Sequence, residues 1–161
     1  MLFIKGLNMK ILITGIPCSG KTYFAKKLSK KIGIKHFEEK DFVTSNNSKV
    51  SIDKVKDVDL NKFSKILNKK LPKNFILSGL LSPYCLSKYT FNFDIIFVLM
   101  PDLKILRKRL KERKYSDLKI TENLFVQEEN LIIHSLAKEL KTIKKPLILP
   151  LNQESIKKLI E

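Results

Sequence analysis

Short runs of apolar residues alternate along this chain with longer stretches in which apolar positions recur every three or four residues. The short runs predict buried strands at residues 10–14, 34–37, 75–78, 94–99 and 147–149. The helical spacing predicts helices at residues 25–32, 60–67, 103–110, about 117–142 and 156–160. Strands and helices in this alternation predict a three-layer α/β domain with a five-stranded parallel sheet. Such domains bind ligands at the carboxyl ends of their strands.

Glycine and proline mark the ends of several predicted elements. Gly33 follows the first predicted helix, where a left-handed helix terminus favours glycine, and Pro72 follows the second. Gly79 and Pro101 end two of the predicted strands, and the polar stretch 44–49 predicts an exposed loop. Because the pattern contains no internal repeat, residues 1–161 are expected to form a single domain.

Composition agrees with one globular domain. Of the 161 residues, 43% are hydrophobic and 30% are charged, which excludes wholesale disorder. No apolar run approaches the roughly 20 residues of a membrane-spanning helix, so we expect a cytoplasmic protein without a membrane partner. Cys18 and Cys85 are too few for a zinc site or a disulfide framework. Met9 is also a natural start, and residues 1–8 are then an alternative initiation product or an added edge segment.

The formal net charge is +16, from 32 Lys and Arg residues against 16 Asp and Glu residues. A strongly basic surface attracts polyanions such as RNA, because binding releases condensed counterions. A lysine-rich composition bias or a heat-adapted surface produces the same excess. The sequence favours neither explanation over the other.

Residues 15–22 read G-I-P-C-S-G-K-T and match the phosphate-loop pattern G-x-x-x-x-G-K-[ST], with a predicted strand before and a helix after. Backbone N–H groups of such a loop bind phosphate, and the helix N-terminus reinforces them. Lys21 is expected to neutralise the β- and γ-phosphates of ATP, and the Thr22 hydroxyl to coordinate Mg²⁺. A glycine turn that caps a helix is the alternative. The predicted nucleotide-binding residues are Gly15, Cys18, Ser19, Gly20, Lys21, Thr22 and Tyr23.

A basic cluster at residues 107–114 follows the fourth predicted strand. In a small phosphotransferase such residues close over the transferring phosphoryl group. Arg109 and Arg113 are therefore predicted to act in catalysis with Lys21, and Arg113, at the end of its helix, is also predicted to bind nucleotide. The alternative is an ordinary solvated helix face.

Asp41 follows the second predicted strand and is the predicted substrate-binding residue, with a helix N-cap as the alternative role. His36 and His134 have no neighbours in the sequence that indicate a metal site or a catalytic pair. We expect both histidines to be structural.

Four segments together resemble a known family: I-T-G-I-P-C-S-G-K-T at residues 13–22, D-F at 41–42, F-D-I-I-F-V-L at 93–99 and R-L-K-E-R-K-Y-S-D-L-K-I-T-E-N at 109–123. The family is that of the small adenylate-kinase-like ATPases of small-ribosomal-subunit maturation. The resemblance implies a nucleoside-monophosphate kinase fold, ATP with Mg²⁺, and AMP or a similar acceptor bound near residues 38–72. It also implies a lid near 112–122 with Arg113 on the nucleotide, and a small-subunit ribosomal protein or rRNA as partner.

Five positions depart from that family. Ser78 and Leu80 stand where relatives carry an acid and a histidine after the third strand. Met100 replaces a frequent Arg, Lys114 a lid Gly and Gln127 a common acid. We therefore expect ATP binding with slow phosphotransfer or ATPase activity.

Three functions stay open on the sequence alone. One is an adenylate kinase, which transfers the γ-phosphoryl group to AMP. Another is an ATP-gated assembly factor whose basic surface binds rRNA or a ribosomal protein. The last is a kinase for another small metabolite, because a fold does not settle its substrate.

Overall fold

The computed structural model describes residues 8–43, 58–140 and 146–160. Within these ranges five parallel strands form one sheet, in the order β2-β3-β1-β4-β5. The strands are β1 Lys10–Thr14, β2 His36–Glu38, β3 Phe75–Ser78, β4 Ile95–Leu99 and β5 Leu147–Leu151. The prediction of a five-stranded parallel α/β sheet is confirmed.

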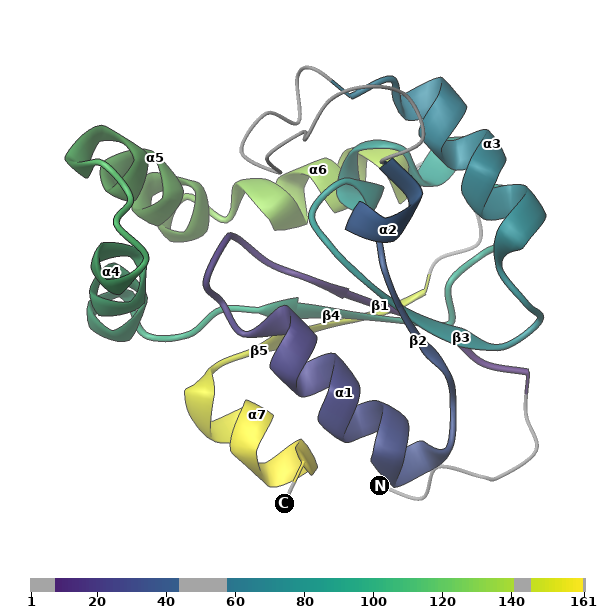
Figure 1. The fold of residues 1–161 in the computed structure, drawn as a ribbon, viewed down its shortest axis with the longest axis horizontal. Coiled ribbons are helices and arrows are strands. Elements are labelled where there is room, and N and C mark those ends of the chain that lie inside the picture. The colour runs from purple at the N-terminus through teal and green to yellow at the C-terminus, as the bar shows by residue number, and fades with distance from the viewer. Residues whose placement is uncertain (1–7, 44–57, 141–145, 161) are drawn as a thin grey trace.

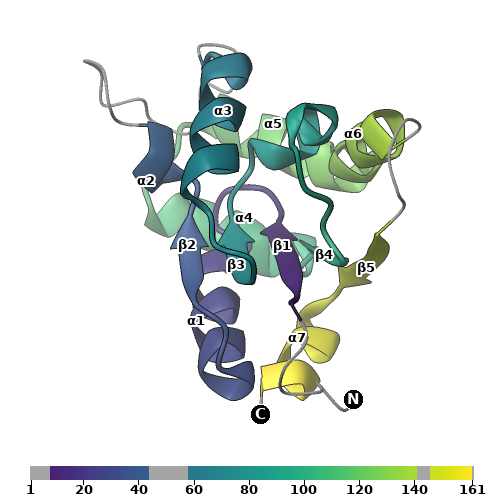
Figure 2. The ribbon, with the colours of Figure 1, turned by 90° about the vertical axis from the view of Figure 1, so that its right-hand side faces the viewer.

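Helices cover both faces of this sheet and make the domain three layers deep (Figure 1). The helices are α1 Lys21–Ile32, α2 Lys40–Val43, α3 Leu60–Lys70, α4 Leu103–Glu112, α5 Asp117–Glu128, α6 Leu131–Glu139 and α7 Gln153–Ile160. Two short 3₁₀ helices, η2 Ser82–Tyr84 and η3 Leu86–Lys88, lie between β3 and β4. Figure 2 shows α3 and α6 on one side of the sheet and α1 and α7 on the other. None of the helices in the described ranges combines the length and the apolar character needed to cross a membrane.

Successive side chains of a strand point to opposite faces of the sheet, so the core consists of two clusters, one on each face. Ile11 and Ile13 of β1 pack with Phe24 and Leu28 of α1, whereas Leu12 belongs to the cluster on the opposite face. The apolar residues of α1 recur at helical spacing, so one stripe of the helix is buried against the sheet. The centre of the sheet is thus buried on both sides, which explains why its strands read as continuous apolar runs.

The opposite face is covered by α3, α5, α6 and the segment that contains η2 and η3. Four aromatic side chains there make edge-to-face or stacked contacts, with ring centroids 4.8–6.0 Å apart: Phe75, Tyr89, Phe91 and Phe93. Aromatic pairs in these geometries stabilise a core beyond the area that they bury.

The single helix predicted over about 117–142 is wrong, because the structure has two helices there. α5 ends at Glu128, and Asn130 then adopts a left-handed conformation with φ 53° before α6 begins at Leu131. Asparagine is one of the few residues that visits this region readily. Ile120 and Leu124 of α5 and Ile132 and Leu136 of α6 enter the same core cluster, so apolar spacing does not reveal the break. Residues 141–142 lie outside the described residues.

Most other predicted boundaries differ from the observed ones by a few residues. The predicted strand at 34–37 is β2, at His36–Glu38, and the predicted first helix begins at Lys21, directly after the phosphate loop. The apolar pattern did not predict η2 or η3. The expected loop at 44–49 lies outside the described residues, as do residues 1–7 of the segment that precedes the alternative start at Met9.

Candidate phosphate-binding site

The sheet order places the loop after β1 at the centre of the carboxyl edge. β1 lies between β3 and β4, and the chain leaves it through residues 15–20 into α1. In open parallel sheets the crevice for ligands lies where neighbouring connections leave in opposite directions. Figure 1 shows this loop at the end of the sheet where α4 and α5 also lie.

The loop needs conformations that favour glycine. Gly15 has φ 150° and Gly20 has φ 97°, and Cys18 also lies in the left-handed region with φ 65°. A Cβ on Gly15 would lie 2.7 Å from Ser19 Oγ and 2.8 Å from the backbone oxygen of Leu99. Gly20 caps α1, so the free N–H groups of the first turn are directed at the loop. This arrangement provides backbone donors and a helix N-terminus for an anion.

Lys21 projects back over the loop. Its Nζ donates hydrogen bonds to the backbone oxygens of Gly15 and Ile16, each at 2.8 Å. The pKa of Lys21 is lowered to about 8, mainly by burial; Glu39 and Cys18 partly oppose this shift, and the nearby charge of Arg113 adds to it. The buried hydroxyl of Ser19 has no hydrogen-bond partner among the described residues. A desolvated cation and an unpaired hydroxyl are both groups that a phosphate would satisfy.

A cavity of about 310 Å³ opens between the loop, the ends of β2 and β3, α2 and the corner between α4 and α5. Its lining residues are Pro17, Cys18, Gly20, Lys21, Thr22, Tyr23, Glu38, Glu39, Lys40, Val43, Ser78, Gly79, Leu80, Leu81, Arg113 and Tyr115. Most of the residues predicted to bind nucleotide are therefore together. Gly15 and Ser19 lie in the loop but are not among these lining residues.

The two predicted catalytic arginines differ in position. Arg113 caps the C-terminal end of α4 and lines the cavity. Arg109 donates from Nη1 to the backbone oxygen of Cys18 at 3.3 Å and is not among the lining residues. In this structure Arg109 supports the loop from its side, while Arg113 is directed toward the cavity.

The predicted lid at 112–122 is a corner between two helices. Lys114 turns the chain with a left-handed φ of 58°, and Tyr115 N donates to Leu110 O at 3.2 Å. Glycine, which the sequence analysis expected at this position, adopts such a conformation without strain. Ser116 then caps α5 by accepting from Lys119 N at 3.3 Å.

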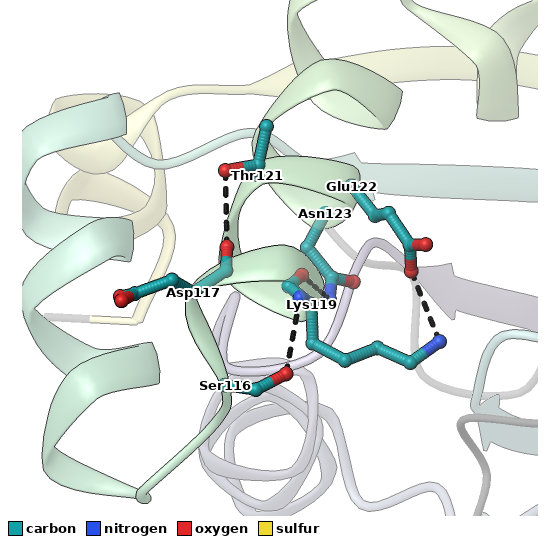
Figure 3. A network of polar contacts seen from close by, with 6 residues as sticks. All are labelled: Ser116, Asp117, Lys119, Thr121, Glu122 and Asn123. Carbon is teal, nitrogen blue, oxygen red and sulfur yellow. Dashed lines mark hydrogen bonds and ion pairs between the residues drawn. The ribbon is translucent and has the colours of Figure 1, made fainter.

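Polar side chains along the first turns of α5 bond within their own helix (Figure 3). Thr121 Oγ1 donates to Asp117 O at 3.0 Å, and Lys119 Nζ lies 3.0 Å from a carboxylate oxygen of Glu122. These residues do not line the cavity. The corner therefore reaches the cavity through Arg113 and Tyr115.

Asp41, the predicted substrate-binding residue, is exposed on α2 and is not among the lining residues. Its neighbours Glu38 and Lys40 line the cavity and form an ion pair at 2.5 Å. The role assigned to Asp41 stays a prediction. Residues 44–57 of the predicted acceptor region lie outside the described residues.

Glu39 is a lining residue that the sequence analysis missed. Its carboxylate accepts hydrogen bonds from Leu81 N at 2.7 Å, from Ser82 N at 3.0 Å and from the Ser82 hydroxyl, and the side chain is only 2% exposed. Burial raises the pKa of Glu39, and the hydrogen bonds partly oppose that effect. Its position directly after a predicted strand could have indicated that Glu39 lines the cavity. Glu38 and Asp41 lie at the same end of that strand, so position alone did not single out Glu39.

Three of the positions at which the chain departs from the family that it resembles make contacts within the fold. The Ser78 hydroxyl lies 2.7 Å from His36 Nε2, which links β3 to β2. Gln127 is buried and donates to Pro101 O at 2.5 Å, and Met100 packs against the core. His36 thus has the structural role that we expected.

A strand, a glycine loop of phosphate-loop sequence and a helix, set at the carboxyl edge of a five-stranded parallel sheet, define a P-loop protein with a kinase fold. Residues 11–131 match the family model described as "AAA domain". Because the match covers most of the chain, the protein belongs to that family.

Two archaeal relatives carry the name "Putative adenylate kinase". The protein from Pyrococcus abyssi is 33% identical over 117 residues, which are 72% of this chain and 62% of the relative. The protein from Pyrococcus furiosus is 34% identical over 127 residues, which are 78% of this chain and 67% of the relative. The chain thus spans about two thirds of the length of these relatives.

Solved kinase structures share the fold. The deoxyadenosine kinase from M. mycoides with bound dATP matches with a TM-score of 0.58 and 21% identity, over 94% of this chain and 95% of its own. The shikimate kinase from Acinetobacter baumannii in complex with shikimate matches with a TM-score of 0.61 and 14% identity, over 97% and 90%. At these identities the likeness establishes the fold alone.

Proposed function

We propose that this protein is a phosphotransferase that binds Mg²⁺-ATP in the phosphate loop and transfers the γ-phosphoryl group to AMP or a similar nucleoside monophosphate. The observation that carries the proposal is Lys21, a desolvated cation that faces a cavity together with Arg113. The kinase fold and the names of the archaeal relatives support it.

The loop fits the triphosphate of ATP. The first turn of α1, which begins after Gly20, has backbone N–H groups available for a phosphate, and Lys21 supplies a positive charge beside the loop. The buried Ser19 hydroxyl without a partner adds a donor. Thr22, which lines the same cavity, has a hydroxyl of the kind that holds Mg²⁺ in phosphate loops, where the ion neutralises developing phosphate charge.

Transfer requires few reactive side chains. An oxygen of the acceptor phosphate attacks the γ-phosphorus, the bond from that phosphorus to the β–γ bridging oxygen breaks, and ADP leaves. Lys21 and Arg113 stabilise the negative charge on the moving group, because both line the cavity. Arg109 acts through the loop, whose Cys18 oxygen it binds.

The acceptor enters from the side of β2 and α2. Lys40 and Val43 line that side of the cavity, with Leu80 and Leu81 opposite, so a cation and apolar groups are available for a phosphate and a base. AMP is the acceptor that the names of the relatives favour. A different small metabolite is the alternative, since the same fold occurs in a shikimate kinase.

A second candidate function is an ATP-gated assembly factor for the small ribosomal subunit, with a ribosomal protein or rRNA as partner. The observation that favours it is at the end of β3, where Ser78 bonds to His36 and apolar Leu80 lines the cavity. Neither side chain can act as a general base there. The net charge of +16 is compatible with an RNA partner.

The deciding experiment measures ADP formed from Mg²⁺-ATP with AMP, with other monophosphates and without an acceptor. Lys21→Ala is the inactive variant, and Lys26→Ala, at an exposed position of α1, is the matched control. ADP that forms only with AMP, and is lost in Lys21→Ala alone, supports the kinase. ATP binding without acceptor-dependent turnover supports the assembly factor, and equal ATP binding by Lys21→Ala contradicts the phosphate-loop assignment.

A further inference from the structure

The candidate nucleotide site lacks an acidic residue at the ends of the two strands next to β1. Phosphate-loop enzymes hold Mg²⁺ with the loop Ser or Thr and with an acid beyond the loop. The strands on either side of β1 end at Ser78 and Leu99, neither of which is acidic. Among the described residues that line the cavity, Glu38 and Glu39 carry a carboxylate. Among the residues that the structure describes, the candidate acid therefore comes from the end of β2, one strand farther from the loop.

Glu39 rather than Glu38 has the position for this role. The carboxylate of Glu38 is held by Lys40 at 2.5 Å, and Lys40 is exposed. Glu39 is directed inward, is 2% exposed and lines the same cavity as Lys21 and Thr22. Its attraction to Lys21 is among the charge interactions that affect both groups.

The backbone directs this side chain across the end of β3. Glu39 N donates to Ser78 O at 2.9 Å, which extends the pairing of β2 with β3 by one residue. From there the side chain runs over Gly79, and a Cβ on Gly79 would overlap the carboxylate of Glu39. A residue without a side chain at position 79 is thus what allows an acid from β2 to occupy the space beside the end of β3.

The oxygen donors on this side of the cavity suit Mg²⁺. Thr22 offers a hydroxyl and Glu39 a carboxylate, and oxygen is the ligand type that Mg²⁺ prefers. No three Asp, Glu, His or Cys residues of the described chain gather into a metal cluster. An ion that arrives with ATP and depends on one hydroxyl and one acid agrees with this arrangement.

We propose that Glu39 supplies the acid of the Mg²⁺-nucleotide site, in place of an acid at the end of β3. The inference rests on the proposed function, because it requires that the loop binds Mg²⁺-ATP. Glu39 would act as a positioning residue, whose carboxylate holds the ion from the wall of the cavity that Thr22 also lines. The same carboxylate also binds Leu81 N and Ser82 N and so fixes the start of η2.

A purely structural role for Glu39 is the competing explanation, since two backbone N–H groups depend on it. The two explanations differ in what Mg²⁺ does to ATP affinity. A structural loss weakens ATP binding equally with and without the ion, whereas loss of the acid weakens binding only when the ion is present.

The test measures the Kd of a fluorescent ATP analogue twice, with saturating Mg²⁺ and with a chelator. The Kd with the chelator divided by the Kd with Mg²⁺ is the magnesium enhancement. Glu39→Gln is expected to lower this ratio by about 10- to 100-fold, the usual cost of losing a group that supports a metal site. The Kd measured with the chelator is expected to change by less than about threefold. Glu38→Gln, beside it in the sequence, is the matched control and is expected to keep the ratio of the wild type.

A relocation variant makes the test independent of the hydrogen bonds to Leu81 and Ser82. Glu39→Leu removes the acid, and Ser78→Asp in the same chain returns one at the end of the neighbouring strand. The double variant is expected to recover most of the magnesium enhancement, although it cannot restore the bonds to η2.

The outcomes separate the two proposals. If the wild type binds Mg²⁺-ATP but Glu39→Gln keeps its magnesium enhancement, or the double variant stays as low as Glu39→Leu, the inference is wrong and the proposed function stands. If the wild type itself does not bind ATP, both are wrong.

Discussion

The phosphate loop at residues 15–22 and the junction between the ends of β2 and β3 face the same cavity, but they are built in different ways. The loop presents backbone groups and one cation that are consecutive in the sequence. The junction presents the carboxylate of Glu39, which reaches backbone donors 42 and 43 residues away. One region depends on local chain geometry, and the other on a single tertiary contact.

The two regions also differ in what constrains their glycines. Gly15 is enclosed by the Ser19 side chain and also by a backbone oxygen, that of Leu99, which belongs to the central sheet and cannot move far. Gly79 is enclosed by a side chain, that of Glu39, which can be removed by one substitution. Glycine is thus required in the loop by a backbone oxygen as well as by a side chain, and at the junction by a side chain that one substitution can remove.

Gly15→Ala is expected to have the largest effect. The added Cβ meets Leu99 O at 2.8 Å, and φ 150° is unfavourable for alanine, so the free energy of unfolding should fall by about 3 kcal/mol. Urea denaturation measures the loss. Gly33→Ala, at φ 72° with open space around it, is the control and should cost about 1 kcal/mol. Equal losses at the two positions would contradict the role of the Leu99 contact.

Gly79→Ala should cost somewhat less, about 2 kcal/mol, because the Glu39 side chain can partly move away. In a Glu39→Ala background the three atoms nearest to the added methyl group are absent, so the same substitution should cost much less. A double-mutant cycle by urea denaturation should then give a coupling energy of about 1–2 kcal/mol. Additive losses would mean that another contact constrains Gly79.

The lowered pKa of Lys21 should make the stability of the protein depend on pH, and this effect comes from the loop rather than from the junction. The pKa of Lys21 is about 8 in the folded protein, against 10.5 for the ordinary side chain. Between these values the unfolded chain binds the proton and the folded protein does not, so stability rises with pH. Relative to Lys21→Met, the nucleotide-free wild type should gain about 2 kcal/mol between pH 8 and pH 10. A constant difference across that range would show that Lys21 is well solvated.

The smallest expected effect is at the corner between α4 and α5. Lys114 has φ 58°, which a side chain disfavours and glycine accepts. Lys114→Gly should therefore raise the free energy of unfolding, but by less than about 1 kcal/mol, since glycine also makes the unfolded chain more flexible. Thermal unfolding measures the change, with Lys111→Gly inside α4 as a control that should be destabilised. A loss of stability in Lys114→Gly would contradict this account.

Much of the fold was predictable because its signals are local. The apolar runs at β1 and β3 and the helical spacing of α1 and α4 come from residues that are neighbours in the chain. The phosphate loop was predictable for the same reason, because its donors and its lysine lie within eight residues. Arg113 at the end of a helix followed from the position of its helix.

Other features depend on contacts that no local pattern encodes. The break at Asn130 is hidden because α5 and α6 both place apolar residues in one core cluster. The position of Arg109 against Cys18 depends on how α4 packs beside the loop.

By itself, the sequence determined the alternation of strands with helices, the parallel sheet and the phosphate loop, since each follows from spacing or from backbone groups adjacent in the chain. Only the tertiary structure decided which carboxylate is buried beside the end of β3. Glu38, Glu39 and Asp41 are nearly indistinguishable in the sequence. The pairing of β2 with β3 directs Glu39 over Gly79 and into the site, whereas Glu38 pairs with Lys40 and Asp41 is exposed.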